Sequence, residues 1–140
     1  VEQAEPEEDE ALAALDRGDY AAAEASYRAL LERKPNDVYG KLGLAQVQLL
    51  IRTDGLDAAA IMKDAIERSD DVELQMQCAD VEIMGGYLEP GFKRLLALIT
   101  NLSGDEQKRV KDRLLELFAL VDPADPRVIK ARAQLANALF

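Results

Sequence analysis

The residue types that carry out most enzyme chemistry are scarce in this sequence. It contains no histidine, which excludes Ser-His and Cys-His nucleophile pairs, histidine general bases and most zinc sites. It also contains a single cysteine, Cys78, so neither an internal disulfide nor a Cys-x-x-Cys pair can form within these 140 residues. Cys78 stands near Met76 and Ala79 in a predicted helix. We interpret it as a small buried thiol, with a reactive thiol as the alternative.

Paired carboxylates are the remaining groups that could transfer protons. Asp70–Asp71 and the pair Asp122 and Asp125 each place two acids close together, but with 27 acidic residues such proximity is expected by chance. Both pairs stand at predicted helix starts, where acids cap backbone N–H groups. Neither a phosphate-binding glycine loop nor a calcium-binding loop pattern occurs. We therefore predict that the chain is not an enzyme and uses no cofactor and no metal.

Composition and charge narrow the choice of partners. Apolar residues make up 49% of the chain and aromatic residues 5%, a balance typical of close-packed helices. The net charge is −10, which argues against nucleic-acid binding. One local basic cluster is interpreted as the solvated face of a helix; it consists of Lys108, Arg109, Lys111 and Arg113. No signal peptide and no membrane-spanning apolar run is present, so we expect a cytoplasmic protein.

The first ten residues are strongly acidic. They hold six acids and no base, and without them the net charge would be −4. Stretches of this kind are solvated and resist folding on their own. We predict that residues 1–10 are an acidic linker or the start of the first helix.

Turn and capping residues divide the chain into about eight helical segments. Pro90 is expected at the first position of the sixth helix, and Asp125 and Pro126 as the cap and first residue of the eighth. Because the connections are about two to five residues long, neighbouring helices should be antiparallel. The expected helices cover about residues 7–17, 20–33, 37–52 and 56–69, and the last four begin near residues 71, 90, 104 and 126.

The second segment and its flanks carry a repeat signal. Its residues are Gly18, Tyr20, Ala23, Tyr27, Leu30 and Pro35. Gly86 lies 68 residues after Gly18, or two periods of about 34 residues, while the middle turn glycine is shifted to Gly55. This spacing is typical of tetratricopeptide repeats (TPRs). We predict an all-α, TPR-like array of antiparallel helical hairpins over residues 11–140, ending in a capping helix pair.

More specific similarity lies towards the C-terminus. The residues that carry it are Gly104-Asp105-Glu106, Leu114–Phe118, Asp125–Val128 and Leu139-Phe140, together with Gly18–Glu24 and Cys78–Glu82. In these residues the chain resembles the TPR-like C-terminal half of the YbbN/CnoX family of bacterial thioredoxin-like co-chaperones. The actinobacterial branch is the most similar.

The resemblance implies a protein-folding factor. Such proteins hold unfolding clients and pass them to chaperone machines, here a GroEL-type chaperonin or an Hsp70-type chaperone. The resemblance also implies a thioredoxin domain before Val1, which this chain lacks and which would supply any mixed-disulfide chemistry. Because this chain has no Cys-x-x-Cys pair, redox activity does not carry over to it.

The last predicted helix has two apolar stripes. Val128, Ala131, Leu135 and Leu139 form one, and Ile129, Ala133, Ala136 and Phe140 form another about 130° away, with Arg132 between them. One stripe is enough to pack against the preceding helix. The second either packs into the core or serves as a docking face for a chaperone or a client, by helix-in-groove recognition.

The third helix offers other candidate contacts. In a hairpin array the first helix of each pair lines the concave face, which places Tyr39, Lys41 and Gln46 there. Capture of a peptide's terminal carboxylate by this groove is a weaker alternative, because the required set of Lys, Asn and Arg is not in register.

Two functional hypotheses follow from these patterns. The first is a protein–protein interaction domain of a thioredoxin-fused co-chaperone, which binds unfolding clients and docks to chaperone machinery. The second is a non-catalytic scaffold or self-association domain that positions the missing thioredoxin domain, with a homo-oligomer as its expected state.

Overall fold

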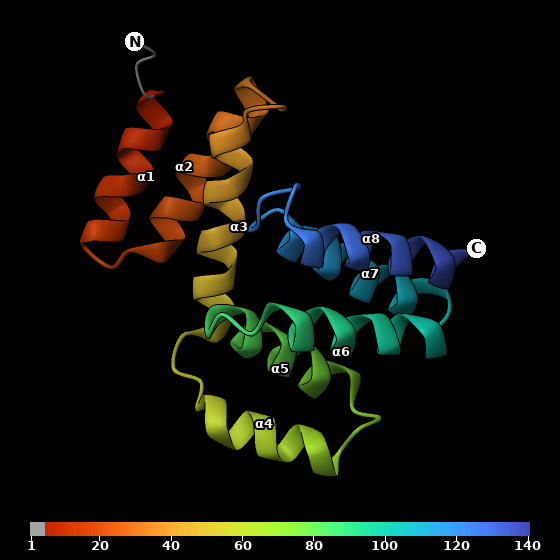
Figure 1. Ribbon diagram of the computed structural model, residues 1–140. Helices are drawn as coiled ribbons and strands as arrows, with labels where there is room; N and C mark the ends of the chain where they lie inside the picture. Colours follow the sequence, from red (N-terminus) through yellow and green to blue (C-terminus); the bar gives the residue numbers. More distant parts are fainter. Residues whose placement is uncertain (1–4) are drawn as a thin grey trace. The chain divides into compact units, whose positions relative to one another are not determined.

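The computed structural model describes residues 5–140, and within that range all regular structure is α-helical. Eight helices follow one another along the chain (Figure 1). Their bounds are α1 Pro6–Asp16, α2 Tyr20–Arg33, α3 Val38–Thr53, α4 Ala58–Glu67, α5 Val72–Met84, α6 Leu88–Asn101, α7 Gly104–Phe118 and α8 Pro126–Leu139. The all-α fold with about eight helices is confirmed.

The helices form two compact units, residues 1–52 and residues 53–140. The first unit holds α1, α2 and nearly all of α3, and the second holds α4 to α8. Residues 1–4, including Glu2 of the acidic stretch, lie outside the described residues. Residues 6–10 are the first turns of α1. That residues 11–140 act as one domain stays a prediction.

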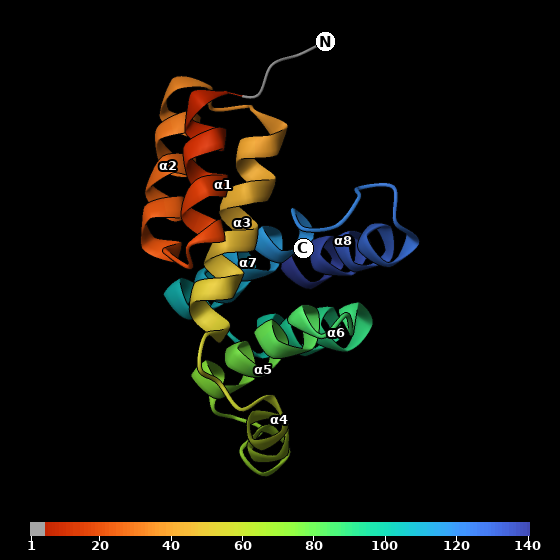
Figure 2. The same ribbon diagram turned by 90° about the vertical axis from the view of Figure 1, so that its left-hand side faces the viewer.

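Helices α1, α2 and α3 lie side by side in the first unit (Figure 2), and small residues make up most of their core. Its core contains Ala11 and Ala14 of α1, Ala23 and Tyr27 of α2, and Val47 of α3. The ring of Tyr27 lies where a side chain on Gly43 would be, since a Cβ there would stand 2.3 Å from the ring. Only glycine permits this close contact between α2 and α3.

The acidic start of α1 is paired rather than fully solvated. The Arg33 guanidinium, at the end of α2, lies 2.6 Å from a Glu5 oxygen and 2.7 Å from a Glu7 oxygen, and Lys34 pairs with Glu5 as well. These cations lower the pKa of Glu5. Ion pairs therefore connect the start of α1 to the end of α2.

The second unit is built around α5 and α6. Helix α4 packs on α5, α5 packs on α6, and α6 packs on both α7 and α8. Helices α6 and α8 lie side by side and begin at the same end (Figure 1). Phe92 of α6 and Phe118 of α7 meet edge to face, with ring centroids 5.0 Å apart, in the centre of the core.

Turn and cap chemistry explains the helix boundaries. Gly18, Gly55 and Gly86 all adopt positive φ at turns, the conformation that glycine reaches without strain. Asp125 caps α8 and Pro126 is its first residue, as predicted. The prediction for Pro90 was wrong by two residues, because α6 begins at Leu88. Proline is tolerated there because N–H groups in the first turn need no partner within the helix.

Candidate protein-binding surfaces

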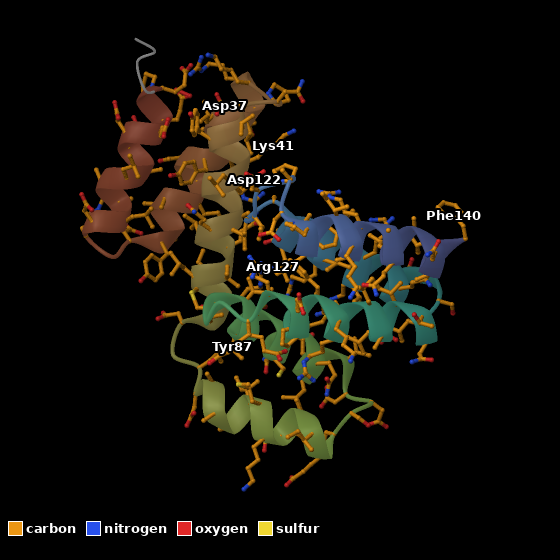
Figure 3. The ribbon with its side chains drawn as sticks, viewed as in Figure 1. Asp37, Lys41, Tyr87, Asp122, Arg127 and Phe140 are labelled. Atoms are coloured by element: carbon orange, nitrogen blue, oxygen red, sulfur yellow. The ribbon has the colours of Figure 1, made fainter. Side chains whose placement is uncertain are left out.

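One apolar stripe of helix α8 faces the core, and the other lies at the surface. Val128, Ala131 and Leu135 are buried in the second unit. On the other stripe Ile129 is 55% exposed and Phe140 fully exposed. Figure 3 shows Phe140 at the end of α8. Ala133 and Ala136, which lie between them on the same stripe, are exposed too. We call these four residues the α8 apolar face.

Arg132 lies at the edge of the α8 apolar face. Its guanidinium carbon is 4.9 Å from the centroid of the Phe118 ring. A cation at this distance from an aromatic face is attracted by the ring quadrupole. Phe118 is 1% exposed, so the contact holds Arg132 against a rigid part of the core. The structure thus brings together all five predicted site residues of the last helix.

The predicted site residues of α3 do not share one face. Tyr39, Lys41 and Gln46 are all exposed. At about 100° per residue, Tyr39 and Gln46 fall on the same side of the helix, whereas Lys41 falls about 140–160° away from them. A partner bound along the Tyr39 side would therefore not reach Lys41 directly. These residues as a binding site stay a prediction.

A groove between the first halves of α6 and α8 forms a second surface of the second unit. Its volume is about 340 Å³. We call it the α6–α8 groove, and its lining includes Glu89, Phe92 and Lys93 of α6 and Arg127, Lys130 and Gln134 of α8. Figure 3 labels Arg127 near the start of α8. Three of these six side chains are cationic and one is acidic.

Asp71 and Asp125, one acid from each pair considered above, have structural roles. Asp71 accepts a hydrogen bond from the Leu74 N–H at 3.1 Å, and Asp125 accepts one from the Arg127 N–H at 2.8 Å, so both are helix caps. The hydrogen bonds that Asp125 accepts from Arg127 lower its pKa to about 2. A carboxylate with that pKa does not donate protons near neutral pH.

Cys78 is buried and held in its thiol form. It has no exposed surface, and its Sγ lies 3.6 Å from a Glu82 oxygen. Burial, followed by the charge of Glu82, raises the pKa of Cys78 to about 11. Because the thiolate is the reactive form, this environment makes Cys78 inert at neutral pH. This geometry supports our interpretation of a structural thiol.

The described residues offer neither a metal site nor a membrane-spanning helix. Among residues 5–140, no group of three or more His, Cys, Asp or Glu side chains is placed to hold a metal ion. Over the same residues, none of the helices combines the length and the apolar character that crossing a membrane requires.

Helical hairpins with left-handed turn glycines, together with exposed helix faces, define a helical-repeat binding domain. A tetratricopeptide repeat family matches residues 51–140, and this chain belongs to that family. The TPR-like fold is thereby confirmed. TPR domains are generally non-catalytic modules that bind other proteins.

The relatives of the chain are longer proteins. Two of them, from Mycobacterium bovis and Mycobacterium tuberculosis, are 41% identical over 127 residues, and each is named an uncharacterized protein. The match covers 90% of this chain but 41% of each relative. The chain thus spans less than half the length of the curated relatives it matches. No solved structure matches the chain.

The α6–α8 groove was not predicted from the sequence. Its lining residues come from two helices that are distant in the sequence; Lys93 and Lys130, for example, are 37 positions apart. One signal was nevertheless present in the sequence. Residues 126–139 contain Arg127, Lys130 and Arg132 but no acid, in a chain whose net charge is −10. That local imbalance makes α8 the most basic of the eight helices.

Proposed function

We propose that this domain binds other proteins through the α8 apolar face, as the interaction module of a co-chaperone. In this role it holds unfolding clients and docks to a GroEL-type chaperonin or an Hsp70-type chaperone in the cytoplasm. The resemblance to thioredoxin-like co-chaperones supports the proposed partners. The greater length of its relatives supports a role within a larger protein.

The exposure of the α8 apolar face is the observation that carries the proposal. Ile129 and Phe140 stand 11 positions apart, three helical turns, with the smaller Ala133 and Ala136 between them. Two large side chains at the ends of a shallow stretch are suited to fill pockets on a partner while the helix backbone approaches closely. Interfaces derive most of their binding energy from a few large side chains of this kind.

Arg132 adds a polar contact beside the α8 apolar face. Because Phe118 already holds its guanidinium, Arg132 loses little conformational freedom when a partner binds. Arginine next to exposed apolar residues is typical of interface positions that contribute strongly to binding.

The proposal is tested with purified chaperones and a chemically unfolded enzyme as the client. The double variant Ile129→Ser/Phe140→Ser removes the large side chains of the α8 apolar face. We expect it to bind the chaperone at least about tenfold more weakly and to lose protection of the client against aggregation. Biolayer interferometry measures the first effect and light scattering the second.

A matched control comes from α4. Met62 and Ile66 are also exposed apolar residues of the second unit, at 37% and 80%. Met62→Ser/Ile66→Ser should leave chaperone affinity within about twofold of the original. Equal losses of affinity in both variants would indicate nonspecific hydrophobic binding instead of a defined site. Absence of binding to either chaperone by the unaltered domain would refute the co-chaperone role.

Self-association is the second candidate function. Ala133 and Ala136 would let the α8 helices of two copies pack at a close interaxial distance of about 8 Å. In this case the domain would be a scaffold that places two copies of a longer protein together. Sedimentation velocity should then show a dimer that Ile129→Ser/Phe140→Ser converts to a monomer.

A further inference from the structure

The α6–α8 groove holds cations that have no partner within the described residues. Several exposed basic side chains elsewhere pair with an acid, such as Arg33 with Glu7 and Lys108 with Asp112. Lys93 and Lys130 make no hydrogen bond or ion pair with any of residues 5–140, and they line one groove together. Both side chains are exposed, on the two walls of the same groove.

The other charged groups of the groove leave its positive character in place. Glu89 is the one acid of the lining, and Arg127 is bound by Asp125, with its Nη2 2.8 Å from an Asp125 oxygen. Counting Asp125, three cations face two acids. The groove therefore has an excess positive charge in a protein whose net charge is −10.

The surroundings of the groove strengthen its attraction for anions. Both helices begin at this end of the second unit, so the groove lies beside the first turns of two helices, where the helix dipole is positive. Phe92, which is 2% exposed, provides a rigid apolar floor between the two lysines. A volume of about 340 Å³ admits a short peptide stretch but is small for a folded surface.

We propose that the α6–α8 groove binds an acidic peptide segment of a partner protein, with its carboxylates against Lys93 and Lys130. The inference rests on the proposed protein-binding function and deepens it by stating the charge of the bound segment. The two surfaces are separate, because Lys130 and Gln134 lie about 100° or more around α8 from Ile129. One partner can contact both, with an apolar element on one side and an acidic tail on the other.

Peptide carboxylates fit this groove better than nucleic acid does. Nucleic-acid binding depends on many cations that follow a phosphate backbone. Here two free lysines are flanked by Glu89 and Asp125, which would repel an extended row of phosphates. A short acidic segment can place its carboxylates against the two lysines without running past both of these acids.

The test uses a labelled peptide with the sequence of residues 1–10, which carries six acids and no base. Fluorescence anisotropy measures its affinity for the whole chain at low salt. The comparison peptide has every Glu and Asp replaced by its amide. We expect the acidic peptide to bind at least about fivefold more tightly, and to lose that advantage as salt is raised.

Variants then locate the site. Lys93→Gln/Lys130→Gln should weaken acidic-peptide binding by about fivefold to twentyfold, because two charge contacts are lost. Lys63→Gln/Lys108→Gln removes the same charge from α4 and α7 and should change binding by less than about twofold. Equal losses in the two variants would overturn the proposal, as would equal binding of the two peptides.

Two additional measurements separate the alternatives. Ile129→Ser/Phe140→Ser should bind the acidic peptide normally, so failure of the proposed chaperone docking and failure of the groove are distinguishable. A single-stranded oligonucleotide with the same number of charges should compete poorly. Competition as strong as that of the acidic peptide would overturn the assignment of a protein ligand.

Discussion

Helices α5 and α8 belong to the same unit but treat their polar side chains in opposite ways. Helix α5 is buried along most of its length, with Glu73 and Met84 exposed near its ends, and its buried polar residues are Gln75, Asp80 and Glu82. Helix α8 is buried along one stripe only, and its cations lie at the surface. The charges of α5 are neutralised within the fold, whereas Lys130 of α8 has no partner among residues 5–140.

Both buried carboxylates of α5 pair with an arginine among the described residues. Arg113 donates to Asp80 at 2.7 Å, and Arg94 donates to Glu82 and to Gln75, each at 2.6 Å. The Gln75 amide in turn donates to the Ala65 carbonyl at the end of α4. No buried side-chain N or O atom of the described residues lacks a hydrogen-bond partner. These contacts fix the positions of α4, α6 and α7 around α5.

This contrast separates structural charge from charge available for recognition. A buried ion pair is costly to break, because its remaining partner is left uncompensated in a low-dielectric interior. An exposed cation without a partner adds little to folding, but it attracts an acidic ligand. We therefore expect changes at α5 contacts to alter stability, and changes on the outer side of α8 to alter binding.

The largest effect is expected at the buried pair of α5 and α7. Arg113→Met removes the guanidinium that lies 2.7 Å from Asp80, whose side chain is 2% exposed. We expect the free energy of unfolding to fall by about 3–5 kcal/mol. Urea denaturation followed by circular dichroism measures the loss.

The neighbouring exposed pair is the control. Arg109 pairs with Glu73, and their side chains are 50% and 59% exposed. Arg109→Met should cost less than about 1 kcal/mol. The double variant Asp80→Leu/Arg113→Met should recover much of the loss, because no lone charge remains. A similar cost for Arg109→Met and Arg113→Met would remove the distinction between buried and exposed charge.

The two stripes of α8 provide the next comparison. Leu135→Ala removes a side chain that is 7% exposed, so it leaves a cavity and should cost about 2–4 kcal/mol. Ile129→Ala removes a side chain that is 55% exposed and should change stability by no more than about 0.5 kcal/mol. Thermal and urea unfolding measure both. A large loss at Ile129 would mean that the α8 apolar face supports the fold instead of a partner.

Local features of the sequence predicted the helices well. Turn glycines such as Gly18 and Gly86, and the cap at Asp125, act within a few residues, so their effect can be recognised without a structure. The 100° periodicity also placed the two stripes of α8 correctly. It did not show whether the Ile129 stripe is exposed or packed into the core, because that depends on which helices pack against α8.

Contacts between distant residues could not be predicted. The cluster from Lys108 to Arg113 was interpreted as a solvated helix face, which was wrong for Arg113. Its side chain is 17% exposed and binds Asp80, 33 positions away. The α6–α8 groove depends likewise on the packing of two helices, which no local pattern encodes. Charge composition indicated only that α8 is basic.

A smaller effect than those at Arg113 and Leu135 is expected from Cys78, as a dependence of stability on pH. Burial gives Cys78 a pKa of about 11 in the folded chain, above its ordinary value of 9.0. The folded state therefore holds the proton more tightly than the unfolded state, so stability is unaffected below pH 9 and falls as the pH rises towards 11. At pH 10 the loss should be about 1 kcal/mol relative to pH 8.

Comparison with Cys78→Ala isolates this effect. Lysines and tyrosines also titrate in this range, but they are common to both proteins, so the difference between the two unfolding free energies reports the thiol alone. That difference should shift by about 1 kcal/mol between pH 8 and pH 10, in favour of the alanine variant at the higher pH. A constant difference would mean that the thiol ionises as easily in the folded chain as in the unfolded one. In that case the interior around α5 would be less closed than its ion pairs indicate, and the contrast with α8 would be weakened at one of the most buried residues of α5.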